Sequence, residues 1–160
     1  MSPIPELRPG AVEILLIEDN PRDAEMTQRA LSKHRLANRL VWVKDGEEAL
    51  EVIFGEATDP TAPLAQTPRL VLLDLKMPKV DGHEVLRRLR QDGRTRAIPV
   101  VVLTSSQEEM DLELSYQNGA SSYIVKPVDF ANFAEAIQQL GMYWVLLNQL
   151  PRSFSTGSPE

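Results

Sequence analysis

LVLLDLKMPKVDGHEVL, the stretch at residues 70–86, joins an aliphatic run to a helical pattern through a short polar turn. The run Leu70–Leu73 is continuous and apolar, which is typical of a strand buried on both faces of a parallel sheet. The helix predicted over Gly82–Gln91 buries one face, made of Val85, Leu86 and Leu89. A strand, a turn and a helix in this order predict one βα unit of an α/β fold.

The same alternation extends along most of the chain. The other predicted strands are Val12–Ile17, Leu40–Val43, Val100–Leu103 and Ser122–Val125. One further helix is predicted to begin at Pro21, after an Asn20 cap. The other predicted helices cover Gly46–Phe54, Ser106–Asn118 and Phe130 to about Asn148. Over Ser106–Asn118 the apolar residues alternate as in a strand, but a parallel sheet needs a crossover helix there. We therefore predict (βα)5 architecture, a flavodoxin-like doubly wound parallel sheet with strand order 2-1-3-4-5.

The chain of 160 residues is long enough for one domain with a proper core. Residues 1–11 are predicted to be a flexible arm and residues 149–160 a disordered tail, which leaves 12–148 as the folded domain. The connection over residues 55–68 is polar, rich in proline and longer than is usual between a helix and a strand.

Composition excludes several classes of function. Cysteine is absent, which excludes a disulfide scaffold and a thiol nucleophile. The two histidines lack the spacing of metal ligands. The net charge of −6 argues against a nucleic-acid partner, and no apolar run is long enough for a membrane span. The N-terminus lacks the apolar stretch of a signal peptide, so a cytoplasmic protein is expected.

Polar side chains stand at the carboxyl ends of four predicted strands. Glu18 and Asp19 follow the first strand and Asp74 follows the third. Thr104 follows the fourth strand and Lys126 the fifth. In the order 2-1-3-4-5 these strands are neighbours, so their ends should converge on one patch. Each residue alone also fits turn or capping chemistry, but their joint occurrence favours a functional site.

Three carboxylates in one patch repel one another, and burial raises the cost of their charge. A hard divalent cation such as Mg²⁺, which prefers oxygen ligands, would neutralise them, and Lys126 adds a fixed positive charge. A carboxylate that faces such charges is placed to attack phosphorus and form an aspartyl phosphate. The Thr104 hydroxyl would be a further donor to the oxygens of the phosphoryl group.

Four separated motifs resemble the receiver domains of two-component response regulators. They are LLIEDNP at 15–21, LVLLDLKMPKVDGHEVL at 70–86, IPVVVLTSS at 98–106 and GASSYIVKP at 119–127. The resemblance covers about residues 12–147 and agrees in both order and spacing. It implies a histidine kinase as partner and no enzymatic activity beyond the protein's own phosphorylation and dephosphorylation.

The resemblance also implies a role for each polar residue. Asp74 would be the phosphoacceptor. Asp19 and Asp74 would ligate Mg²⁺ directly, with the backbone carbonyl of Lys76, and Glu18 would act through a water molecule. Lys126 would bind the phosphoryl group.

Phosphorylation would be read out through a switch. By the same resemblance Thr104 is the switch hydroxyl, Tyr123 is the aromatic switch residue, and the Lys126–Pro127 bond is cis. The face that responds would be formed by Ser106–Asn118, Ser122–Val125 and the helix from Phe130.

A finer resemblance is to the small response regulators paired with bacterial phytochromes. It rests on the long connection at 55–68, on SSYIVKPVDFANFAEAI at 121–137 and on QQLGMYWVLLN at 138–148. With no output domain after the last helix, a single-domain regulator is expected, which would act as an output, a phosphate shuttle or a phosphate sink.

Other functions fit the residues less well. An aspartyl-phosphate hydrolase wants a second Asp two residues after the nucleophile, where this chain has Lys76. A flavodoxin-like nucleotide binder wants a Gly/Ser/Thr loop after the first strand, where this chain is acidic. A degenerate receiver that acts as a phosphorylation-independent interaction module is the remaining alternative, although every acidic, Thr and Lys residue of the site is present.

The last predicted helix carries an apolar stripe and then changes character. The stripe consists of Phe130, Phe133, Ile137, Leu140, Trp144 and Leu147. After Gly141 the helix is apolar on all sides, which predicts a homodimer through Tyr143, Leu146 and Leu150. The basic cluster of Arg87, Arg88, Arg90, Arg94 and Arg96 is interpreted as a solvated face, with kinase docking as the alternative.

Overall fold

A computed structural model describes residues 13–32, 40–55, 63–75, 77, 80–105 and 116–141 of the chain. The strands are β1 (Ile14–Ile17), β2 (Leu40–Val43), β3 (Leu70–Asp74), β4 (Val100–Thr104) and β5 (Ser122–Val125). The helices are α1 (Pro21–Ser32), α2 (Gly46–Phe54), α3 (Gly82–Gln91) and α5 (Phe130–Gln139). Strands and helices alternate as predicted from β1 to β4, and most of the helix predicted between β4 and β5 lies outside the described residues.

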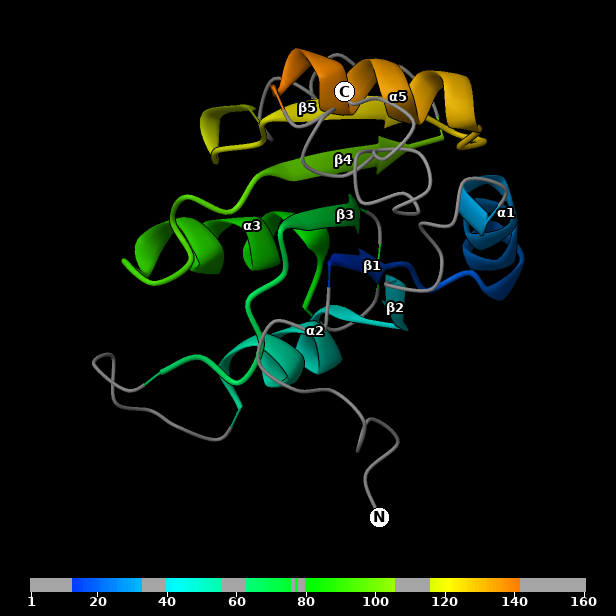
Figure 1. The fold of residues 1–160 in the computed structure, drawn as a ribbon. Helices are drawn as coiled ribbons and strands as arrows, with labels where there is room; N and C mark the ends of the chain where they lie inside the picture. Colours follow the sequence, from blue (N-terminus) through cyan, green and yellow to red (C-terminus); the bar gives the residue numbers. More distant parts are fainter. Residues whose placement is uncertain are drawn as a thin grey trace, which may run out of the picture.

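All strand pairs are parallel, and the sheet has the order β2-β1-β3-β4-β5, which confirms the predicted topology (Figure 1). Strand β3 includes Asp74 and strand β4 includes Thr104, one residue beyond each predicted end. Asp74 pairs in register with Leu103, and Thr104 pairs with Val125. These residues therefore belong to the sheet itself, which holds their backbone rigidly.

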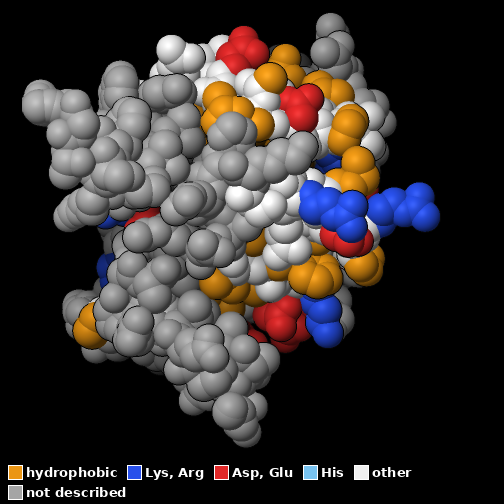
Figure 2. Space-filling view, turned by 45° about the vertical axis from the view of Figure 1, so that its right-hand side comes forward, with side chains coloured by type: hydrophobic (Ala, Val, Ile, Leu, Met, Phe, Trp, Pro, Cys, Tyr) orange, Lys and Arg blue, Asp and Glu red, His pale blue; other side chains and the backbone are white. Residues whose placement is uncertain are grey.

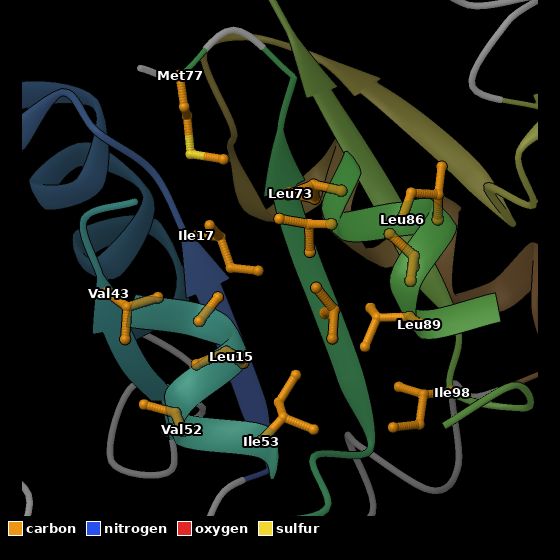
Figure 3. Packing of buried hydrophobic residues seen from close by; sticks show 14 residues of the cluster. Leu15, Ile17, Val43, Val52, Ile53, Leu73, Met77, Leu86, Leu89 and Ile98 are labelled. Carbon is orange, nitrogen blue, oxygen red and sulfur yellow. The ribbon is translucent and has the colours of Figure 1, made fainter. Parts of the chain in front are cut away.

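The sheet is covered by helices on both faces because its central strands are apolar throughout. Strands β1, β3 and β4 are buried at every position. Ile14 and Leu16 pack with α1 and α5, whereas Leu15 and Ile17 pack with α2 and α3. Figure 3 shows the second layer, in which side chains from the sheet meet those of the two helices. Alternation along each strand thus supplies two cores from one apolar run.

Side-chain caps begin the helices close to the carboxyl edge of the sheet. Asn20 Oδ1 accepts from the backbone N–H of Arg22 and Asp23 at 2.9 and 3.1 Å, which confirms the predicted cap of α1. Asp81 caps α3 by accepting from Glu84 N at 3.0 Å. Because a cap sets where a helix starts, it also sets which side chains of the first turn face the strand ends.

The end of α5 differs from the prediction. The helix ends at Gln139, and Gly141 adopts a positive φ of 74°, a conformation that stops a helix. The prediction of one continuous helix to about Asn148 is therefore wrong. The predicted dimer residues Tyr143, Leu146 and Leu150 lie outside the described residues, as do most of Ser106–Asn118, Lys76 and the predicted arm and tail.

The arginine cluster is only partly a solvated face. Arg90 donates to the carbonyl oxygens of Gly119, Arg96 and Ile98 at 2.9, 2.9 and 2.7 Å, and burial lowers its pKa. It therefore ties α3 to the chain on either side of β4. On the face shown in Figure 2, basic side chains lie next to acidic ones.

Candidate functional site

The carboxyl ends of four strands surround a pocket of about 310 Å³. Its lining consists of Glu18, Asp19, Asn20, Asp23, Asp74, Leu75, Leu103, Thr104, Ser105 and Lys126. The structure therefore brings together Glu18, Asp19, Asp74, Thr104 and Lys126, the five residues that the strand ends predicted. This convergence follows from topology, since β1, β3, β4 and β5 are successive neighbours in the sheet.

Three carboxylates of the pocket form an acidic cluster. One carboxylate oxygen from each of Glu18, Asp19 and Asp74 lies within 4.8 Å of the others. Burial raises the pKa of Glu18 to about 7, and burial with the neighbouring Asp74 also raises the pKa of Asp19. Oxygen ligands at this spacing, destabilised by their own charge, suit a hard divalent cation. The cluster could therefore bind such an ion.

Lys126 supplies the positive charge of the pocket. Its Nζ lies 2.9 Å from Glu18 Oε1, 3.0 Å from Asp23 Oδ2 and 3.6 Å from Asp74 Oδ2. Burial alone would lower the pKa of this lysine, but its bonds to Glu18 and Asp23 and the nearby charges raise it. Lys126 is thus a fixed cation at neutral pH.

The backbone places Lys126 beside Thr104. Lys126 N donates to the carbonyl oxygen of Thr104 at 2.7 Å, and the following Lys126–Pro127 bond is cis, as the resemblance implied. Thr104 is buried at the end of β4 and lines the pocket. Its hydroxyl is therefore near the acidic cluster.

Strand β2 holds the backbone of the acidic turn after β1. Glu18 N donates to Val43 O at 3.0 Å, and the Trp42 indole Nε1 donates to Glu18 O at 2.7 Å. Both polar groups of the Glu18 backbone are thus bonded to one neighbouring strand. This arrangement fixes the direction of Asp19, the next residue.

A glycine allows α3 to approach the end of β3. Gly82 N donates to Leu75 O at 3.0 Å. A Cβ added at Gly82 would lie 2.5 Å from Leu75 Cα and 2.6 Å from Asp74 O, which is too close for any side chain. The backbone that carries Asp74 is therefore packed directly against the start of α3.

Tyr123 does not line the acidic pocket. It is 36% exposed and packs edge-to-face against Tyr116, with ring centroids 6.3 Å apart. Both tyrosines border a second pocket between β5 and α5. Among the described residues, the pairing of β4 with β5 connects the two positions, since Thr104 pairs with Val125 and Val102 pairs with Tyr123.

Asp23 is the pocket residue that sequence reasoning missed. Its carboxylate bonds to Lys126, yet it lies in the first turn of α1 and not at a strand end. An available signal was its place three residues after the Asn20 cap, because that position is in the turn nearest the strand ends. Residues in the first turn of a helix, such as Asp23, are not found when only the strand ends are searched.

A doubly wound sheet that carries buried acids, a threonine and a lysine at its carboxyl edge defines a class of signalling protein, the receiver. Residues 14–138 match the response regulator receiver domain. The chain belongs to the response regulator receiver domain family.

Two relatives match most of their own length. The chain is 40% identical over 138 residues to "Probable methanogenesis regulatory protein FilR2" of Methanothrix harundinacea, covering 86% of each chain. It is 33% identical over 138 residues to response regulator Rcp1 of Synechocystis, covering 86% of this chain and 92% of the relative.

Solved structures agree with this assignment. The bacteriophytochrome response regulator AtBRR is 51% identical, with a TM-score of 0.70 over 90% of this chain and 99% of AtBRR. The Mn²⁺-bound form of Rcp1 is 31% identical, with a TM-score of 0.64 over 88% and 97% of the two chains. The phosphorylated cyanobacterial phytochrome response regulator RcpA is 35% identical, with a TM-score of 0.64 over 88% and 96%. Phytochrome response regulators are thus among the chain's structural neighbours.

Proposed function

We propose that this protein is a phosphorylation-dependent signalling switch that accepts a phosphoryl group on Asp74 from a histidine kinase, with a phytochrome-type kinase as its partner. The observation that carries the proposal is the single pocket in which Asp74 lies with Glu18, Asp19, Thr104 and Lys126. The phytochrome partner is supported by the similarity to AtBRR and RcpA.

In the proposed step, an Asp74 carboxylate oxygen attacks the phosphorus of a phosphohistidine. The O–P bond forms, the N–P bond breaks, and the electron pair of that bond returns to the imidazole of the kinase. The Lys126 ammonium group and the Thr104 hydroxyl, which both line the pocket, would donate to phosphoryl oxygens, whose charge must be stabilised during transfer.

Mg²⁺ is the proposed cofactor. Asp19 and Asp74 would hold it, with the carbonyl of Lys76 and, through water, Glu18. When bound, it would neutralise the acidic cluster and the phosphoryl oxygens. The fit is supported by the spacing of the three carboxylates and by the pKa of Glu18, which burial and the neighbouring Asp74 raise to about 7 despite the contact with Lys126.

Phosphorylation would act through a two-state element. Thr104 would move toward the phosphoryl group, and Tyr123, paired edge-to-face with Tyr116, would be repositioned with it. The responding face would be the one around β5 and α5. Unchanged NMR spectra of this face after beryllofluoride binding would count against the switch.

Phosphotransfer profiling tests the function directly. Autophosphorylated histidine kinases from the same organism, a phytochrome-type kinase among them, are mixed with the protein in Mg²⁺ or in EDTA. We expect rapid transfer from the phytochrome-type kinase in Mg²⁺ and none in EDTA. Transfer from a different kinase alone would overturn the phytochrome assignment, and absence of transfer from every kinase and from acetyl phosphate would overturn the switch.

A further inference from the structure

The Lys126 ammonium group donates a hydrogen bond to Asp23 Oδ2 at 3.0 Å and forms an ion pair with Glu18 Oε1 at 2.9 Å. Both oxygens are within hydrogen-bond distance of Nζ. Asp74 Oδ2 at 3.6 Å is not. Lys126 therefore makes its two closest contacts on the side of β1 and α1, and its ion pair with the proposed phosphoacceptor is the longest of the three.

Asp23 differs from the other carboxylates of the pocket. It comes from α1 and not from a strand end, and its side chain is 32% exposed whereas that of Glu18 is fully buried. The cap at Asn20 fixes it, because the backbone N–H of Asp23 donates to Asn20 Oδ1 at 3.1 Å. The Asp23 carboxylate thus contacts the Lys126 side chain, which is only 13% exposed.

We propose that Asp23 is a positioning residue that holds the Lys126 ammonium group closer to α1 than to Asp74 and competes for it with a phosphoryl group on Asp74. This inference rests on the proposed function and adds a residue that regulates how readily Asp74 is phosphorylated. A phosphoryl group gains the lysine only to the extent that it binds Nζ better than Asp23 does, because a ligand shifts an equilibrium by its differential affinity alone. Asp23 also adds negative charge that repels an incoming phosphoryl anion.

Asp23→Asn removes the competing charge and nearly preserves side-chain shape. At saturating Mg²⁺ we expect the variant to bind beryllofluoride about fivefold more tightly than the wild type, which corresponds to about 1 kcal/mol at 1.36 kcal/mol per tenfold. Phosphorylation by acetyl phosphate should accelerate in the same direction. Saturating metal is needed because loss of a nearby carboxylate also weakens cation binding.

Glu25→Gln is the matched control. Glu25 lies on the same helix two residues further along and pairs with Arg29 at 2.9 Å on the exposed surface. It removes the same charge without touching the pocket lining. We expect its beryllofluoride affinity to equal that of the wild type.

A second measurement needs no bound ion. In metal-free protein, denaturation midpoints of Asp23→Asn, Lys126→Gln and the double variant should be non-additive, whereas the same cycle with Glu25→Gln should be additive. Should Lys126→Gln fail to fold, the beryllofluoride comparison still decides.

The proposal is overturned by either of two results in a wild type that is labelled normally. One is beryllofluoride affinity in Asp23→Asn that is unchanged or weaker. The other is an equal gain in Glu25→Gln, which would show a general charge effect. A wild type that neither binds beryllofluoride nor accepts phosphate would instead refute the proposed function itself.

Discussion

Glu18 is fully buried beside Asp74, Asp19 and Lys126, and its ionisation works against folding. Burial raises its pKa from 4.5 to about 7, so within that window the folded protein keeps a proton that the unfolded chain has released. The metal-free protein should therefore lose free energy of unfolding as pH rises from about 4.5 to 7, and Asp19, whose pKa is also raised, adds to the loss.

Urea denaturation in EDTA at several pH values measures this slope, with Glu18→Gln for comparison. The variant should show a flatter profile and a higher midpoint above pH 7, because it has no charge to bury. An identical slope in the two proteins would show that Glu18 does not titrate in this window.

Trp42 acts on the site only through the backbone. Its indole donates to Glu18 O at 2.7 Å, and Phe at this position would keep the ring but lose the bond. One net hydrogen bond is worth about 1 kcal/mol, so Trp42→Phe should lower the free energy of unfolding by about that amount. Urea denaturation measures this, with the exposed Met26→Ala as control. Equal stability of Trp42→Phe and wild type would show that this hydrogen bond does not hold the turn after β1.

At the scale of elements, the contact between β3 and α3 sets the position of Asp74. Gly82→Ala would place a Cβ 2.6 Å from Asp74 O, so helix or strand must shift. Overpacking of this kind costs about 1–3 kcal/mol, and we expect a matching loss in the free energy of unfolding and slower phosphorylation.

Gly93→Ala is the control for that change, because nothing lies within 4 Å of a Cβ added there. It should leave both properties unchanged or slightly improved. Equal stability of the two alanine variants would mean that α3 has room to move away from β3.

Elements were predictable to the degree that burial determines them. The runs that form β1, β3 and β4 are apolar because both faces of these strands are covered. That pattern predicted the strand order and therefore also the convergence of the strand ends. Asp23 and Arg90 were not predictable in this way. Their roles depend on side-chain direction and on contacts with residues far along the chain, Lys126 and Gly119, which periodicity does not encode. The stop after Gln139 depends on the local φ of Gly141.

At the scale of the whole molecule, no helix among the described residues is long and apolar enough to cross a bilayer.

The sequence after Gly141 is rich in apolar residues, which are unfavourable in water unless another surface buries them. We therefore expect a homodimer through Tyr143, Leu146 and Leu150, all outside the described residues. Analytical ultracentrifugation at about 100 μM, well above a micromolar dissociation constant, should show a dimer that Leu146→Glu disrupts. A monomer at that concentration, or a dimer that survives Leu146→Glu, would contradict this interface.

The central claim is that the pocket at the carboxyl edge of the sheet directs phosphate to Asp74. Peptide mapping by mass spectrometry after treatment with acetyl phosphate and Mg²⁺ tests it most directly. We expect one phosphate, on the peptide that contains Asp74, in the wild type and in Asp81→Asn, since Asn caps α3 as well as Asp does. We expect none in Asp74→Asn. Full labelling of Asp74→Asn, or a phosphate mapped to any other residue of the wild type, would contradict the account.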